Sequence, residues 1–282
     1  MFVAAIGITA AFIFGCADFL GGLAARRSHV VLVTGVAAVT GLVILLLSWP
    51  LTGGALSWEA AAWGAASGFS GALAIALLYA CLAVGPMSIL SPLTAIVSAV
   101  VPMTVGLVRG ESLQSPGYLG LGLALVAVVL VGFVPERGAV RPSGRGLAMA
   151  VGSGAMIGLF LVLIEQAPHD SGMIPLLFNR GVNAVLMLAT LVGLRLTGRL
   201  GRPLPVGGVR IAMAGGVVDA LANAMLLVGV RIGDLAVMGV LTALYPAGTI
   251  VLAAGVLKER IAPVQWGGLG IALGATVLLS LG

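Results

Sequence analysis

The sequence predicts an all-α, polytopic membrane protein in which ten transmembrane helices form two inverted five-helix repeats. The first supporting observation is composition: 60% of the 282 residues are hydrophobic and 8% are charged. A soluble domain carries about 25% charged residues to cover its surface. The other two observations are the spacing of the apolar segments and a match between the two halves of the chain.

The composition excludes several classes of protein. With 14 basic and 9 acidic side chains, a chain of this length cannot solvate a globular surface, which excludes a water-soluble enzyme. It is also too apolar to be disordered. The net charge of +5 comes from arginines in short gaps between apolar segments, as in membrane proteins. We therefore expect a lipid bilayer as the surroundings and no nucleic-acid partner.

The apolar segments account for ten spans, because one transmembrane helix takes about 20 apolar residues. They lie at residues 2–24, 29–50, 59–84, 87–108, 115–135, 146–166, 174–196, 209–230, 233–256 and 263–281. The separations at 85–86 and 231–234 are narrow. We interpret each as a tight hairpin, since one helix of about 50 residues would be far longer than a bilayer is thick. A basic loop at 136–145 divides the chain into repeats at 1–135 and 146–282.

The two halves match when the first is shifted by 148 residues. The matched residues are Gly85 with Gly233, Leu93-Thr94-Ala95 with Leu241-Thr242-Ala243, Glu111 with Glu259, and Gly120-Leu121-Gly122 with Gly268-Leu269-Gly270. With five spans in each half, the second half must insert upside down relative to the first. This inverted-repeat arrangement is typical of transporters that work by alternating access.

Several motifs resemble the EamA family of the drug/metabolite transporter superfamily. In the first half they are Leu78-Tyr79, Gly85-Pro86, Ser91-Pro92, Pro102 and Gly110-Glu111; in the second they are Leu244-Tyr245-Pro246, Leu257-Lys258-Glu259-Arg260 and Gln265. The stretch from Phe14 to Phe19 is similar to the first span of that family. The resemblance implies ten helices, export or exchange of small metabolites, and both termini in the cytoplasm.

The distribution of basic residues indicates the opposite orientation. Eleven Lys and Arg residues fall on the side of the basic loop: Arg26, Arg27, Arg137, Arg141, Arg145, Arg195, Arg199, Arg202, Arg210, Lys258 and Arg260. The other side has Arg109, Arg180 and Arg231. The positive-inside rule places the richer side in the cytoplasm and both termini outside. Either way, we expect a multi-pass protein of the plasma membrane.

Asp219 is the leading candidate for a binding residue, because it lies near the middle of its predicted span. A charge in hydrocarbon costs at least about 2.5 kcal/mol and so needs a reason. Asn223 follows one turn later on the same face. We expect this pair to bind a proton or a cationic substrate group; the alternative is a structural hydrogen bond to a neighbouring helix.

The seventh span carries a polar group made of Asn179, Arg180 and Asn183. If the seventh and eighth spans pack together, Arg180 can reach Asp219, and pairing makes both charges cheaper to bury. The pair would be either a rearranging element of transport or a static clamp. Asp18, in the last third of the first span, is a candidate for substrate contact or for a position at the helix end.

Other polar residues have weaker signals. Tyr79, Tyr245, Thr94 and Thr242 are candidates for the wall of a cavity, with helix packing as the alternative. Pro92, Pro102 and Pro246 interrupt the fourth and ninth spans, as in many transporter sites. Glu111 and Glu259 occupy matching turns, where local ion pairs and helix capping explain them as structural acids.

The sequence indicates a secondary transporter rather than an enzyme. No zinc-site, nucleophile-elbow, phosphate-loop or dinucleotide motif is present, so we expect no catalysis, cofactor or metal. We expect an exporter of small organic metabolites, driven by a proton gradient or by exchange, with a cavity lined by spans 1, 3, 4, 6, 8 and 9. The alternatives are a lipid-linked sugar flippase and a non-transporting membrane scaffold. A homodimer is compatible with the sequence.

Overall fold

The computed structural model describes residues 2–26, 29–84, 87–132, 142–198, 206–258 and 260–281, and this part of the chain is helical throughout apart from short connections. The helices of the first half are α1 (Phe2–Ala25), α2 (Val30–Thr52), α3 (Trp58–Val84), α4 (Met87–Val108) and α5 (Ser115–Gly132). Those of the second half are α6 (Gly144–Glu165), α7 (Ile174–Leu196), α8 (Val206–Ile232), α9 (Leu235–Thr242), α10 (Tyr245–Leu257) and α11 (Pro263–Leu281), with a short 3₁₀ turn, η1 (His169–Ser171), before α7.

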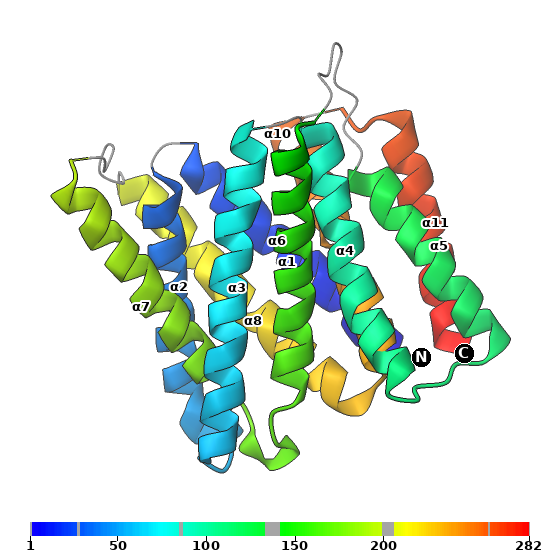
Figure 1. Ribbon diagram of the computed structural model, residues 1–282, viewed down its shortest axis with the longest axis horizontal. Coiled ribbons are helices and arrows are strands. Elements are labelled where there is room, and N and C mark those ends of the chain that lie inside the picture. Colours follow the sequence, from blue (N-terminus) through cyan, green and yellow to red (C-terminus); the bar gives the residue numbers. More distant parts are fainter. Residues whose placement is uncertain are drawn as a thin grey trace.

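The ten predicted spans are confirmed. Ten helical segments of the described chain are long and apolar enough to cross a membrane, the ninth comprising α9 and α10 together. Backbone groups in lipid must bond within their own segment, which explains why the apolar runs become helices. Figure 1 shows α1 beginning at the end of the bundle where α11 finishes. We call this the terminal end; the opposite end, where α1 finishes and α6 begins, is the linker end.

The two halves are related by inversion, as the sequence predicts. The helices α3, α4 and α5 start at Trp58, Met87 and Ser115, each 148 residues before the start of α8, α9 and α11. The helix contacts correspond in the same way when the two halves are exchanged. The pair α3–α6 corresponds to the pair α8–α1, and the pair α2–α8 corresponds to the pair α7–α3. The equivalent helices α5 and α11 pack against each other. The first half begins at the terminal end and the second at the linker end (Figure 1).

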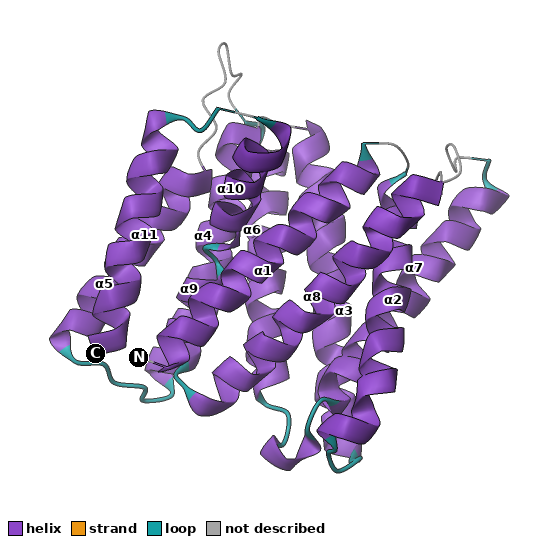
Figure 2. Cartoon of the chain, turned by 180° about the vertical axis from the view of Figure 1, so that it is seen from behind, coloured by secondary structure: helices purple, strands orange, loops and turns teal. Residues whose placement is uncertain are grey.

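The ninth span is interrupted near Pro246, as predicted, whereas the interruption predicted for the fourth span is wrong. The helix α9 stops at Thr242, and α10 starts at Tyr245, with Pro246 in its first turn. Figure 2 shows the connection between them inside the bundle rather than at its edge. Proline has no N–H to donate and fits best in the first turn of a helix. The helix α4, by contrast, continues through Pro92 and Pro102.

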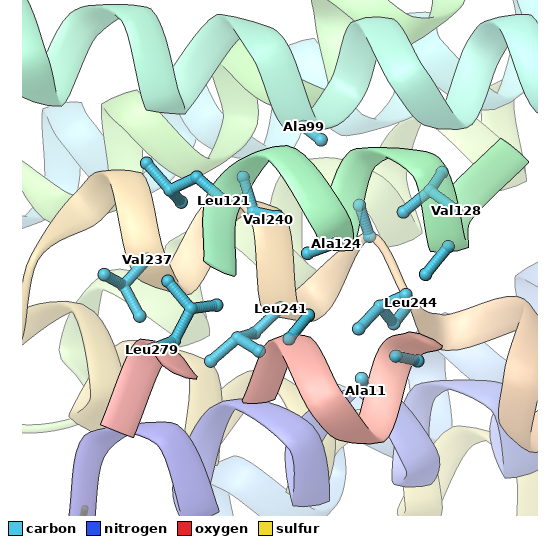
Figure 3. Close-up of a cluster of buried hydrophobic side chains, with 14 of the residues drawn as sticks. Ala11, Ala99, Leu121, Ala124, Val128, Val237, Val240, Leu241, Leu244 and Leu279 are labelled. Carbon is cyan, nitrogen blue, oxygen red and sulfur yellow. The ribbon is translucent and has the colours of Figure 1, made fainter. Parts of the chain in front are cut away.

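A buried apolar cluster holds the α5–α11 pair to the centre of the bundle. It includes Ala11, Ala99, Leu121, Ala124, Val128, Val237, Val240, Leu241, Leu244 and Leu279, which come from both halves (Figure 3). Small residues allow the helices to approach closely. A Cβ atom added to Gly120 would lie 2.9 Å from Leu279 Cγ, and one added to Gly268 would lie 2.8 Å from the backbone nitrogen of Val131.

Candidate functional site

A cavity of about 450 Å³ lies between the two halves. This volume is in the range of small-molecule sites, about 300–1,000 Å³. Its wall is formed by α1, α2, α3, α4, α6, α7, α8, α9 and α10. The structure therefore adds α2 and α7 to the predicted wall. Sequence periodicity does not determine which face of an all-apolar helix points inward, and so α2 carried no signal for this role.

The cavity reaches one end of the molecule and is closed at the other. Towards the linker end its wall extends to Ala25, Val30 and Ala212, which lie at or near helix ends. Towards the terminal end the wall gives way to a cluster of buried side chains that includes Ile164, Leu227 and Leu235. Among the described residues, the cavity wall thus extends towards the linker end and stops short of the terminal end.

Polar bonds between helices reinforce the closed terminal end. Glu111 accepts hydrogen bonds from the backbone nitrogens of Leu235 (2.8 Å) and Ala236 (2.9 Å) and so caps α9. This contact crosses between the halves. Of the two structural roles predicted for Glu111, the structure shows helix capping, although the capped helix belongs to the other half; the neighbouring Arg109 bonds Glu165 on α6, with 2.8 Å between Nη1 and Oε2. Glu259, the matching acid, lies outside the described residues.

Arg231 fastens the turn before α7 at the same end. Its guanidinium donates to the carbonyl oxygens of Gly172 (2.8 Å) and Pro168 (3.1 Å) and to Ser171 Oγ (2.9 Å). The last carbonyls of a helix or turn have no partners within it and need such donors. No role beyond the charge count could be predicted for Arg231, because its partners lie about 60 residues earlier in the chain.

An ion pair within the cavity joins α7 and α8. Arg180 Nη2 lies 2.5 Å from Asp219 Oδ2, and both residues line the cavity. Asn223 supports the acid from one turn later, donating to the Asp219 carbonyl (2.8 Å) and to Oδ1 (3.3 Å). The Nε of Arg180 is buried and has no hydrogen-bond partner among the described residues. The structure thus brings the three residues together in the cavity wall.

Asp18 lies in the same cavity, on α1, and is exposed to its interior. It is close enough to Asp219 and Tyr245 for electrostatic interaction with both. No described residue donates a hydrogen bond to it or forms an ion pair with it. Its place in the cavity wall is two turns before the end of α1.

The asparagines of α7 divide between packing and the cavity wall. Both line the cavity, but Asn179 is buried and its Nδ2 donates to Ser67 Oγ on α3, at 2.9 Å. Asn183 Nδ2 donates to the Asn179 carbonyl, at 3.3 Å. The side chain of Asn179 therefore joins two helices, whereas Asn183 is bonded only within its own helix.

The remaining predicted wall residues are split by the structure. Tyr245 and Thr242 line the cavity at the break between α9 and α10. Thr242 already donates to Met238, with 2.7 Å between Oγ1 and the carbonyl oxygen. Thr94 lies outside the cavity wall; it is buried, and its hydroxyl lies 3.2 Å from the Ala150 carbonyl on α6. The side chain of Tyr79 lies outside what the structure describes.

Two aromatic residues of the wall were missed from sequence. Phe14 and Phe160 line the cavity from α1 and α6. Phe160 lies in a long apolar segment without a neighbour of distinctive type. Phe14 precedes Asp18 by four residues, a spacing that places both on one face of α1 and that could have indicated its role. Asp18 and Asp219 were found because a carboxylate in such a segment is costly and therefore noticeable.

The comparisons with known proteins agree with this architecture. One solved structure, described as "Crystal structure of protein", has the same fold: it aligns over 99% of this chain and 96% of its own, with a TM-score of 0.79 at 15% identity. No curated protein matches the sequence. Residues 144–281 match the model of the EamA-like transporter family. This stretch includes all the helices of the second half, so the second half of the chain is an EamA-like transporter domain.

Proposed function

We propose that the protein is a secondary transporter that exports small organic metabolites by alternating access, driven by a proton gradient or by exchange. One observation carries this proposal: a cavity with charged residues lies between two inverted halves and reaches one end of the bundle. In an inverted repeat, exchanging the conformations of the halves closes that end and opens the other. The broken ninth span, whose ends meet at the cavity, supports the same conclusion.

Export follows from the orientation that we propose for the chain. Among the described residues, Arg26, Arg145, Arg195, Arg210, Lys258 and Arg260 lie at or near helix ends on the linker side. The positive-inside rule places such an end in the cytoplasm. The cavity would then be loaded from the cytoplasm. Labelling of single cysteines at Gly144 and Leu281 in intact cells, in a variant without Cys16 and Cys81, tests this orientation: only the second should react with an impermeant reagent.

The function is tested by comparing metabolites inside and outside cells that express the wild type, the Asp219→Asn variant or no transporter. We expect one pool to move outward with the wild type and to stay inside with Asp219→Asn, although the variant reaches the membrane. Removal of the carboxylate leaves Arg180 without the acid that it now contacts at 2.5 Å. Inward movement would reverse the proposed direction. No change in any pool, despite equal expression, would favour the scaffold.

A lipid-linked sugar flippase is the second candidate, and one observation favours it. Arg26 and Arg210, both exposed, lie close to the cavity rim at Ala25 and Ala212. Basic side chains there would attract a lipid phosphate. Movement of a labelled lipid-linked sugar between leaflets of vesicles containing the protein would support the flippase, and an effect of water-soluble metabolites alone would support the exporter.

A further inference from the structure

The charged groups in the cavity do not balance. Among the described residues of its wall, three are acidic or basic residues: Asp18, Arg180 and Asp219. Arg180 contacts Asp219 at 2.5 Å, so one positive and one negative charge are already paired. Asp18 remains as a carboxylate with no described partner. A group of this kind is expensive inside a membrane protein unless something compensates it.

We propose that the transported molecule is an organic cation, whose positively charged nitrogen binds Asp18 while its apolar body fills the rest of the cavity. This inference rests on the proposed transport function. The ligand would thus supply the positive charge that the wall lacks. Association of a cation with the unpaired carboxylate offsets its desolvation, in the same way as an internal ion pair does.

The space beside Asp18 fits a bulky cationic group. Gly21 and Gly22 follow Asp18 by three and four residues, so they lie one turn along on the same face of α1, and both line the cavity. A Cβ atom added to either glycine would find nothing within 4 Å. The wall is therefore open next to the carboxylate, and a substituted nitrogen can approach it without displacing a side chain.

The rest of the wall fits an apolar, partly aromatic body. Phe14, Ile75, Leu78 and Phe160 line the cavity together with several alanines. Tyr245 lines it close to Asp18, with which it interacts electrostatically. An aromatic ring near a carboxylate is a favourable place for an organic cation, because the ring face attracts positive charge.

An anionic substrate group has no equivalent place. The cation of the wall, Arg180, already contacts Asp219, and its Nε, which has no partner among the described residues, is buried. A carboxylate would have to displace Asp219, leaving two unpaired acids in the site. The wall therefore selects against anions and zwitterions as well as for cations.

Binding to the purified full-length protein in lipid nanodiscs tests the substrate class. The probes are phenyltrimethylammonium, whose charge does not titrate, phenylalanine as the zwitterion and 3-phenylpropionate as the anion. We expect phenyltrimethylammonium to bind about tenfold or more tightly than the other two, as expected when a partly buried charge pair is made or lost. Asp18→Asn should weaken its binding about tenfold, whereas Asp18→Glu should restore it.

The matched control is Asp234→Asn. Asp234 precedes α9 at the terminal end, outside the cavity, and its side chain makes no capping hydrogen bond. This variant should bind phenyltrimethylammonium as the wild type does. The proposal is overturned if the wild type does not bind phenyltrimethylammonium, if it prefers phenylalanine or 3-phenylpropionate, or if Asp18→Asn binds the cation unchanged. The metabolite comparison in cells is independent of this binding test. Transport of an anion there would support the proposed transport function and contradict the cationic substrate.

Discussion

The helices α3 and α8 occupy equivalent positions in the two halves, yet they differ in chemistry. Both line the cavity, and both have a glycine that admits a neighbouring backbone: Gly68 meets Asn179 of α7, and Gly216 meets Ala37 of α2. The 148-residue shift also pairs Asp219 with Gly71. The charged residue is thus present in α8 and absent in α3. The close contact at the glycine is thus present in both halves, whereas both residues of the Arg180–Asp219 pair belong to the second half.

This difference shows which constraints the symmetry imposes. Close approach of helices is needed in both halves, because exchanging their conformations requires equivalent contacts. A binding group is needed once, since a single cavity lies between the halves. The first half contributes Asp18 to that cavity, and the second contributes Arg180 and Asp219.

The largest effect is expected from breaking the ion pair of the second half. Arg180→Gln leaves Asp219 without its cation, and we expect loss of transport together with about 2 kcal/mol of stability. This is below the roughly 3–5 kcal/mol of a fully buried pair, because the cavity admits water. Thermal unfolding in detergent and transport in cells measure the two effects separately.

The double variant Arg180→Gln/Asp219→Asn distinguishes a rearranging pair from a static clamp. It removes both charges, so stability should return close to that of the wild type. A pair that takes part in transport predicts a stable but inactive double variant. A stable double variant with full transport would identify the pair as a clamp and place the chemistry of the cavity on Asp18.

An intermediate effect is expected where the halves are symmetric. Gly120 and Gly268 are equivalent and tightly packed, whereas an added Cβ at the equivalent Gly122 and Gly270 meets nothing within 4 Å. Gly120→Ala and Gly268→Ala should each cost about 1–2 kcal/mol through overpacking. Gly122→Ala and Gly270→Ala should be neutral or stabilise by about 0.5 kcal/mol, because alanine favours the helix.

These four variants are compared by unfolding in a common detergent. Similar losses for Gly120→Ala and Gly268→Ala would support equivalent packing of α5 and α11. If one of them unfolds as the wild type does, the two halves are not packed equivalently at this pair. A loss in Gly122→Ala or Gly270→Ala of the same size would indicate that the losses come from helix composition rather than from contact.

The smallest effect is expected at the equivalent threonines. Thr94 is in reach of the Ala150 carbonyl on α6, whereas the Thr242 hydroxyl bonds only within α9. The Thr94 hydroxyl also bonds the Leu90 carbonyl of its own helix, at 3.0 Å, so it is shared between two acceptors. Thr94→Val should cost about 1 kcal/mol, because the contact between helices is lost with it. Thr242→Val should change stability by less than about 0.5 kcal/mol. Equal melting temperatures for the two variants would contradict this assignment.

Much of the architecture could be predicted from the sequence. The predicted segments agree with the helices to within a few residues, and the 148-residue match anticipated the starts of α8, α9 and α11. Lipid makes this prediction direct, because a segment must be apolar along its length and bond its own backbone. The break near Pro246 was also indicated, although proline alone did not separate it from the continuous α4.

The number of spans, their inverted arrangement and the cost of placing Asp18 and Asp219 within them could therefore be derived from the residues alone, since these depend on local composition and order. The folded chain was needed to show that Arg180 reaches Asp219, that Asp18 has no described partner, and that Glu111 caps α9 of the other half. These contacts depend on how each helix is rotated about its axis. In an apolar helix that rotation is set by packing against its neighbours, which no local pattern records.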